Sequence, residues 1–169
     1  MTVELRTASS DDLDDIVRVF LACWRDSYRG VLPATTIEAM TDQRARVLWQ
    51  RVLGSEAGEV LVAERVSDAG AELLGLTRFA ASGDHADVHS LYVSPDAQGL
   101  GLGSRLLNAA AERLASAGAT DATLWVFANN APSIAFYRKQ GWLPDGEERT
   151  QEEFGERELR LARRLDGTQ

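Results

Sequence analysis

One short segment, residues 98–103, places three glycines at alternate positions in the sequence Q-G-L-G-L-G. Glycine adopts backbone conformations that other residues avoid, and it leaves no side chain on the surface of a loop. Successive N–H groups of such a loop can point at one anion, and a helix that begins near Ser104 would add the positive end of its dipole. The spacing therefore predicts a loop that holds a phosphate or a pyrophosphate. A glycine turn without a ligand is the alternative interpretation of the segment taken alone.

Two familiar phosphate-binding motifs do not fit this loop. The Walker A motif requires a Lys-Ser or Lys-Thr pair after its last glycine, and this chain has none there. The dinucleotide fingerprint requires a third glycine at the position of Ser104. It also requires an acidic residue at the end of the next strand, where residues 127–130 read F-A-N-N. Neither motif therefore assigns ATP or NAD to the loop.

The loop lies between a predicted strand and a predicted helix, in a chain that mixes both kinds of element. Alternating or short apolar runs predict strands at 3–7, 60–66, 73–81, 87–93 and 122–127, with weaker ones around Trp142 and at 156–165. Helical spacing of apolar residues predicts helices after Ser9, after Thr41, at 104–117 and at 132–140. The middle strands predict an antiparallel meander, and the strand, helix and strand that follow predict a crossover. We therefore expect one mixed α/β domain over residues 1–169.

Charge and composition exclude several classes of function. The chain has 18 basic and 26 acidic residues and a net charge of −8, so nucleic-acid binding is not expected, and a cationic small molecule or a basic peptide is favoured as partner. Cys23 is the single cysteine and His85 and His89 are the two histidines, so no disulfide or metal site is expected. The first residues lack the apolar core of a signal peptide, and no apolar run approaches the ~20 residues that cross a bilayer. We expect a cytoplasmic protein without a membrane partner.

Two motifs resemble those of the GCN5-related N-acetyltransferase (GNAT) superfamily. L-Y-V-S-P at residues 91–95, followed by Q-x-x-G-x-G at 98–103, resembles the family's acetyl-CoA signature. The stretch from Leu124 to Trp142 resembles the family pattern L-x-V-x-x-x-N-x-x-A-x-x-F-Y-x-K-x-G-F, with Ser133 in place of the common alanine and Trp142 in place of phenylalanine. The opening segment Leu5-Arg6-x-Ala8 also fits. The resemblance thus covers nearly the whole chain.

The resemblance implies a mixed, mostly antiparallel sheet of about seven strands with flanking helices, splayed between its fourth and fifth strands, with acetyl-CoA in the gap. Backbone groups of Leu91 and Val93 would pair with the pantetheine arm, and the glycine loop would hold the pyrophosphate. The cofactor-binding residues implied in this way are Leu91, Tyr92, Val93, Gln98, Gly99, Leu100, Gly101, Leu102, Gly103, Ser104, Asn130, Ser133 and Tyr137. Leu100 replaces a basic residue often seen in the family's loop, and Arg105 is the residue that could compensate.

The resemblance also implies direct attack of a neutral amine on the acetyl thioester, with no metal. Such a reaction needs a base, a donor to the developing oxyanion and an acid for the leaving thiolate. The Val93 N–H would be the donor, and Tyr137 the acid, because a phenol pKa of about 10 lies near a thiol pKa of ~8.5. Alternation along the strand predicts Asp87, His89, Leu91 and Val93 on one face, and the base would be Asp87 or His89, directly or through water.

The acceptor amine is not identified by the sequence. W-x-x-x-Y-x-G-x-L-P at residues 24–33 resembles a pattern of family members without an assigned substrate, and Trp24 and Tyr28 would line the acceptor pocket. An aromatic wall could receive a cationic amine, although such rings also form ordinary core, as we expect for Trp49. A polyamine, an antibiotic, an amino acid and a protein N-terminus or lysine all remain open as small-molecule or peptide acceptors.

Two other functions use the same features. A domain of this fold could bind CoA as a sensor without turnover, although Tyr137, Asp87 and His89 favour an enzyme. A nucleotide-binding module could use the glycine loop alone. The family resemblance also leaves a homodimer open, because its members are often dimers.

Overall fold

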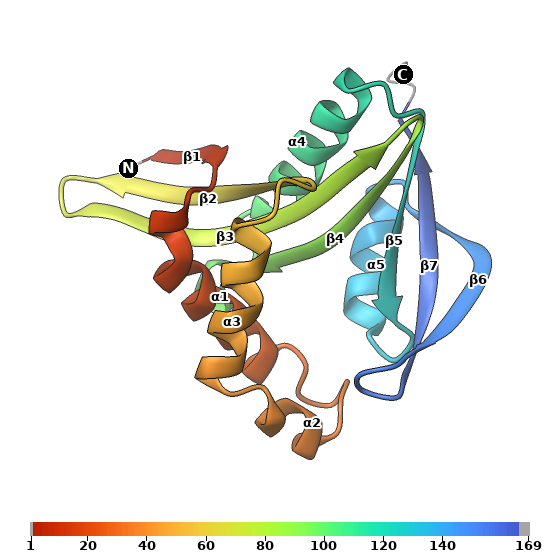
Figure 1. Cartoon of the computed structure of the whole chain (residues 1–169), viewed down its shortest axis with the longest axis horizontal. Helices are drawn as coiled ribbons and strands as arrows, with labels where there is room; N and C mark the ends of the chain where they lie inside the picture. The colour runs from red at the N-terminus through yellow and green to blue at the C-terminus, as the bar shows by residue number, and fades with distance from the viewer. Residues whose placement is uncertain (1, 166–169) are drawn as a thin grey trace.

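A seven-stranded sheet forms the centre of the protein in the computed structural model, which describes residues 2–165 (Figure 1). Its strands are β1 (Thr2–Thr7), β2 (Glu59–Ser67), β3 (Gly70–Ser82), β4 (His85–Val93), β5 (Asp121–Phe127), β6 (Leu143–Gln151) and β7 (Glu156–Arg164). The strand order is β1-β2-β3-β4-β5-β7-β6, and all neighbouring pairs are antiparallel except β4 and β5. The predicted mixed fold and the central meander are confirmed.

Five α-helices of the described chain flank the sheet: α1 (Leu13–Asp26), α2 (Ala34–Ala39), α3 (Asp42–Leu53), α4 (Leu102–Ser116) and α5 (Ala131–Lys139). Sequence periodicity predicts four of them. It misses α2, which is six residues long and buries none of them, so it presents no apolar stripe. No helix within residues 2–165 is long and apolar enough to cross a bilayer.

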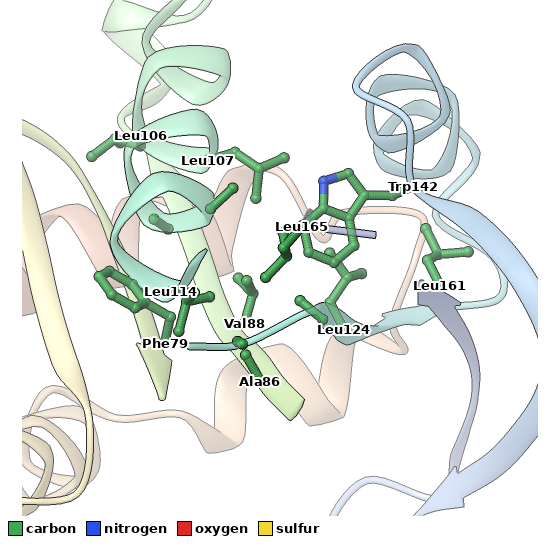
Figure 2. Close-up of a cluster of buried hydrophobic side chains, with 14 of the residues drawn as sticks. Phe79, Ala86, Val88, Leu106, Leu107, Leu114, Leu124, Trp142, Leu161 and Leu165 are labelled. Atoms are coloured by element: carbon green, nitrogen blue, oxygen red, sulfur yellow. The ribbon is translucent and has the colours of Figure 1, made fainter. Parts of the chain in front are cut away.

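Each face of the sheet carries its own hydrophobic core. The α4 core contains the predicted stripe of α4, with Leu106 and Leu107 fully buried, together with Trp142 and inward residues of β3, β4, β5 and β7 (Figure 2). The α1 core, on the other face, joins α1 and α3 to β2 and β3 around Phe20 and Trp49. The two aromatic side chains of α5, Phe136 and Tyr137, pack against the edge of the α4 core. The two cores therefore hold α1 and α4 on opposite sides of the strand that separates them, β4.

The sheet opens between β4 and β5. These strands pair only over His85 to Val88 and Asp121 to Leu124. Beyond those residues the strands diverge, and Figure 1 shows the C-terminal ends of β4 and β5 pointing apart. The backbone edges of residues 89–93 and 125–127 consequently have no strand partner across the gap. The splay that the family resemblance implies between the fourth and fifth strands is confirmed.

A β-bulge at His89 changes which side chains share a face of β4. The strand β3 pairs with Val88 and then, one residue on, with Ser90, which leaves His89 as the extra residue. Val88 and Leu91 therefore both face the α4 core, although strict alternation would place them on opposite faces. The prediction of one common face is wrong, because the bulge separates its members: Asp87 and His89 on one side, Leu91 and Val93 on the other.

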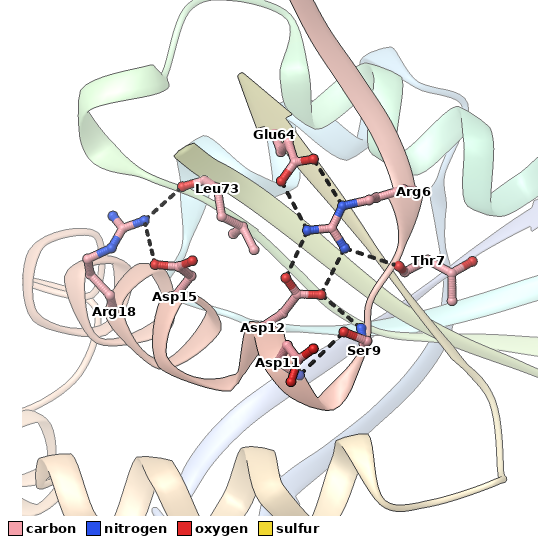
Figure 3. Close-up of polar contacts among 9 residues, drawn as sticks. All are labelled: Arg6, Thr7, Ser9, Asp11, Asp12, Asp15, Arg18, Glu64 and Leu73. Carbon is pink, nitrogen blue, oxygen red and sulfur yellow. Dashed lines mark hydrogen bonds and ion pairs between the residues drawn. The ribbon is translucent and has the colours of Figure 1, made fainter. Parts of the chain in front are cut away.

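A partly buried ion cluster fixes the start of α1. The guanidinium of Arg6 on β1 donates to Asp12 at 2.8 Å and to Glu64 on β2 at 3.0 Å (Figure 3). Asp12 also accepts the backbone N–H of Ser9 at 2.8 Å, which completes a capping box. The hydrogen bond from Arg6 lowers the pKa of the Asp12 carboxyl. The cluster ties the entry of α1 to the sheet, and α1 then runs toward the gap.

Candidate active site

The gap between β4 and β5 widens into a cleft of about 1090 Å³. Segments far apart in the sequence line it: residues 23–31 at the end of α1, 88–93 of β4, most of the glycine loop, 124–127 of β5, α5, and the β6–β7 hairpin. The α4 and α5 side of the cleft is the side predicted for the cofactor. The α1 side, closed by the β6–β7 hairpin, is the side predicted for the acceptor.

The glycine loop has the backbone conformation that its sequence predicts at two of three glycines. Gly99 and Gly101 have φ angles of 84° and 76°. Gly103 is helical instead, and a Cβ there would lie 3.2 Å from Cζ of Phe136, so this glycine permits close packing of α5. Because α4 begins at Leu102, the N–H groups of its first turn have no acceptor within the helix, and the turn borders the cleft. The loop therefore offers free N–H donors beside the positive end of α4.

Side chains of the loop and its neighbours contribute little charge. Leu100 is 62% exposed and Leu102 is buried, so within the loop their backbone alone is placed to bind a ligand. Arg105, expected to replace the missing basic residue, instead donates to the Val3 carbonyl at 3.2 Å and does not line the cleft. Lys139, in the last turn of α5, does line it. Its position within the family pattern is the only sequence signal that marked this lysine.

The exposed edge of β4 is set by its pairing with β3. The Ser94 N–H donates to the Leu74 carbonyl at 2.8 Å, and alternate residues of an antiparallel strand bond to the same neighbour. The N–H and C=O groups of Leu91 and Val93 consequently turn away from β3, toward the gap. The Val93 carbonyl accepts Sγ of Cys23 at 3.1 Å and Nε2 of Gln98 at 3.4 Å, which leaves its N–H facing the cleft.

The side chain of Tyr92 points to the acceptor side of the sheet. Its ring lies 5.2 Å from that of Phe20 within the α1 core. Burial raises the pKa of the Tyr92 hydroxyl, which interacts with the hydroxyl of Tyr28. Tyr92 therefore forms the wall between the core and the acceptor half of the cleft.

The start of α5 brings three predicted residues to the cofactor side. Asn130 caps the helix, accepting the Ser133 N–H at 3.3 Å, and both residues line the cleft. Tyr137 follows one turn later and also lines the cleft. Burial, with a smaller contribution from Tyr28, raises the pKa of the Tyr137 hydroxyl, so it is a weaker acid than its ordinary pKa implies.

Of the two predicted bases, His89 lines the cleft and Asp87 does not. Burial and the nearby Arg78 lower the pKa of His89, which keeps its imidazole neutral at pH 7, and Asp87 partly opposes this shift. Asp87 accepts a hydrogen bond from Thr123 at 2.9 Å at the joined end of β4 and β5. Nδ1 of His85 lies 2.6 Å from Oδ1 of Asp121 in the same place. His89 lies beyond the last β4–β5 pair and reaches the cleft, whereas Asp87 lies where the two strands are still paired.

Aromatic rings form the acceptor half. The ring of Tyr28 lies 5.0 Å from that of Trp24 and 5.5 Å from that of Phe127 on β5. Burial raises the pKa of the Tyr28 hydroxyl well above its ordinary value. Phe154, in the β6–β7 hairpin, lies 5.2 Å from Trp24 and closes this end of the cleft. Trp49, expected in the core, is 2% exposed and lies there.

Sequence reasoning missed the charged wall that β6 and β7 add. Glu158 on β7 is buried, lines the cleft and accepts Nε of Arg149 on β6 at 2.8 Å. The guanidinium of Arg149 lies 4.2 Å from the ring centre of Trp125. Glu158 alternates with Leu159 and Leu161 along β7, so it lies on the face opposite to these leucines. From the sequence alone, that face would be taken as exposed to solvent. Only the strand order β5-β7-β6 turns that face into a cleft wall.

Known proteins share this architecture. Residues 15–142 match the model of the acetyltransferase (GNAT) family. The chain is 32% identical over 155 residues to the L-methionine sulfoximine/L-methionine sulfone acetyltransferase of Pseudomonas aeruginosa, covering 87% of this chain and 84% of that protein. It is 23% identical over 145 residues to the spermidine N(1)-acetyltransferase of Thermoplasma acidophilum, covering 84% and 89%. The crystal structure of PaiA N-acetyltransferase from Thermoplasma acidophilum in complex with coenzyme A superposes with a TM-score of 0.73 at 21% identity, over 97% of this chain and 99% of that one.

A splayed mixed sheet with a glycine loop at the head of α4 is the architecture of an acyltransferase. The chain belongs to the GNAT acetyltransferase family.

Proposed function

We propose that the protein transfers an acetyl group from acetyl-CoA to a primary amine by direct attack of the amine on the thioester. The observation that carries this proposal is the line of unpaired backbone donors along the gap, from Leu91 and Val93 to the free N–H groups at the start of α4. An extended amide-bearing arm can pair with a strand edge, and a pyrophosphate can sit at a helix N-terminus. PaiA, whose structure contains coenzyme A, has the same fold.

Successive parts of acetyl-CoA would bind successive residues along the cleft. Leu91 and Val93 would hold the pantetheine amides, and the backbone of Gly99 to Ser104 would hold the pyrophosphate. Asn130 uses its side-chain oxygen as a helix cap, so its amide NH₂ is available to the arm beside Ser133 and Tyr137. Tyr92 would support this edge from the acceptor side, and Gln98 would fix the Val93 carbonyl.

The chemistry at the thioester would rest on two groups of this chain. The Val93 N–H faces the gap and would donate to the oxygen on which negative charge develops. Tyr137 would donate to the sulfur of the leaving thiolate. Burial raises the pKa of Tyr137 further above that of a thiol, so the hydroxyl stays protonated and available. Its contribution would be donation of a hydrogen bond as charge develops on sulfur.

His89 would be the base that prepares the amine. Its lowered pKa keeps the imidazole neutral near pH 7, so that it can take a proton from the acceptor ammonium, directly or through water. Asp87 lies outside the cleft and would act on His89 through its charge. The acceptor would enter beside Trp24 and Tyr28. The relatives named above act on chemically different amines, so they do not choose among acceptors.

Titration with acetyl-CoA, and with ATP and NAD as competitors, tests the first half of this proposal. We expect binding of acetyl-CoA alone; binding of a nucleotide in its place would favour a nucleotide-binding module. Release of free thiol with a panel of amines tests the second half. Binding of acetyl-CoA without thiol release from any amine would instead identify a CoA sensor of the same fold.

A further inference from the structure

The cleft is lined by more basic than acidic residues, although the chain as a whole is acidic. The chain carries a net charge of −8. Among the described residues that line the cleft, His89 aside, three are basic and two are acidic: Arg29, Lys139 and Arg149 against Asp26 and Glu158. A polycationic acceptor would favour a cleft with an excess of acids. Lys139 lies on α5, on the cofactor side, so the acceptor half has two basic and two acidic residues. Without an excess of acids, the acceptor half fits an acceptor that carries a negative group as well as its amine.

Glu158 provides a buried negative charge at the acceptor half. Its side chain is 9% exposed, and a carboxylate is costly to bury unless charged or polar partners surround it. Within residues 2–165, its carboxylate accepts a single side-chain hydrogen bond, which comes from Arg149 and occupies Oε1. The carboxylate also acts electrostatically on the hydroxyl of Tyr28, whose ring packs on Phe127 beside β7. An acceptor ammonium placed between Glu158 and Tyr28 would give this carboxylate a second charged partner.

Arg149 provides the positive charge beside it. Its side chain is 48% exposed and lines the cleft, and its guanidinium stacks over Trp125, which fixes the plane of the group. Nε is bound to Glu158, while the two Nη groups have no protein partner within residues 2–165. This leaves the outer edge of the guanidinium free for a carboxylate.

We propose that the acceptor is a free amino acid, whose carboxylate binds the Nη groups of Arg149 and whose ammonium lies against Glu158 before His89 removes its proton. The inference rests on the proposed acetyl transfer and names its substrate class. The two charges of an amino acid lie one carbon apart, and the opposite charges of Arg149 and Glu158 are in contact. The aromatic rings of Phe127 and Phe154 are the walls available to its side chain.

Thiol release tests this inference with sets of three amines that differ only in the negative group. Each set contains a free L-amino acid, its carboxamide and the amine without the carboxyl carbon, and spermidine is added as a polycation. For the unmodified protein we expect kcat/KM for the preferred free acid to exceed that for its amide by about tenfold or more. Equal rates for acid and amide, or a preference for spermidine, would overturn the inference and leave acetyl transfer standing.

The variant R149Q should remove the preference by raising KM for the free acid, with the amide little affected, and R149K should keep part of it. The control is R160Q. Arg160 lies 5.9 Å from the same Trp125 ring, but it pairs with Asp145 and does not line the cleft, so R160Q should keep the full preference. Acetyl-CoA affinity measured on R149Q shows whether its fold persists, and the comparison of amines on the unmodified protein needs no variant. No thiol release from any amine would overturn the proposed function together with this inference.

Discussion

The thiol of Cys23 on α1 donates to the carbonyl of Val93 on β4 at 3.1 Å. This contact joins the helix of the acceptor side to the strand edge of the cofactor side, next to the proposed oxyanion donor. Burial raises the pKa of the Cys23 thiol to about 12, so the thiolate is scarce at neutral pH. We therefore expect Cys23 to position the strand edge and not to attack the thioester.

Substitution of Cys23 separates these roles. C23A loses one weak donor, while Gln98 and the pairing with β3 still hold Val93. We expect kcat to fall by no more than about threefold and the free energy of unfolding by about 1 kcal/mol. Thiol-release kinetics and chemical denaturation measure the two effects. An acetylated Cys23 detected by mass spectrometry during turnover, or a loss of activity in C23A of the size expected for a nucleophile, would contradict direct attack.

Removal of the Tyr137 hydroxyl should act on the chemical step. In Y137F the leaving sulfur loses its donor, and we expect kcat to fall about 100-fold while KM for acetyl-CoA changes by less than about threefold. Titration of acetyl-CoA onto the variant checks that the cofactor half is intact. A kcat within twofold of the unmodified protein would remove Tyr137 from the chemistry.

Of the two histidines, His89 and not His85 should control the pH dependence of kcat/KM. Burial and Arg78 lower the pKa of His89, so the base is lost by protonation as pH falls through that lowered pKa. We expect kcat/KM to decline on the acid side, beginning below ~6.5, and H89Q to lose this limb along with about 100-fold in rate. His85 lies outside the cleft, and H85Q should keep the limb. Superimposable pH profiles for the unmodified protein and H89Q would exclude His89 as base.

Stability provides an independent check of the same shifts. His89, with a lowered pKa, binds fewer protons folded than unfolded, so its contribution is lost as pH falls below ~6.5. Asp121 raises the pKa of His85, so the contribution of His85 is present below ~6.5 and lost as pH rises through the folded pKa. Thermal unfolding from about pH 5 to 8 should therefore lose its acid-side slope in H89Q and its alkaline-side slope in H85Q.

Local sequence features predicted the cofactor side well. The turns at Gly99 and Gly101 and the cap at Asn130 depend on a few neighbouring residues, and the structure contains all three. The burial of α4 follows from its own stripe. Even so, apolar spacing along a helix does not fix how much of the helix is buried. Leu48 continues the apolar spacing of α3, yet it is 37% exposed, because Ala45 and Trp49 make the buried contact.

Features that depend on distant pairing could not be predicted in this way. The bulge at His89 exists only in the register of β4 against β3, and it separates residues that alternation places together. The orientation of Arg105 depends on β1, because its partner is the Val3 carbonyl, 102 residues earlier in the sequence. Glu158 becomes part of the cleft only because β7 inserts between β5 and β6.

The Arg6 cluster should be a main support of the N-terminal half. In D12N, Arg6 keeps a neutral partner but loses a charge-assisted one, and we expect a loss of about 1–2 kcal/mol in the free energy of unfolding. Because Arg6 lowers the pKa of Asp12, this stability is present above ~3.9 and lost as pH falls through the lowered pKa. D15N is the control: Asp15 lies 3.7 Å from Arg18 in an exposed pair, which contributes little. Equal losses in D12N and D15N would contradict the special role of the cluster.

Two glycines with left-handed backbone separate strain from ligand binding. Gly101 heads α4 and Gly83 lies at the β3–β4 turn, with φ angles of 76° and 65°, and a Cβ at either would meet no atom within 4 Å. G101A and G83A should therefore lose similar stability, about 1 kcal/mol each, because both force an L side chain into this region. Only G101A should also weaken acetyl-CoA binding, by about tenfold, since relief of the strain turns N–H groups of the loop away from the anion. Calorimetric titration of the two variants measures the difference. Equal affinities would mean that the loop does not hold the pyrophosphate, because the strain is matched and only the position differs.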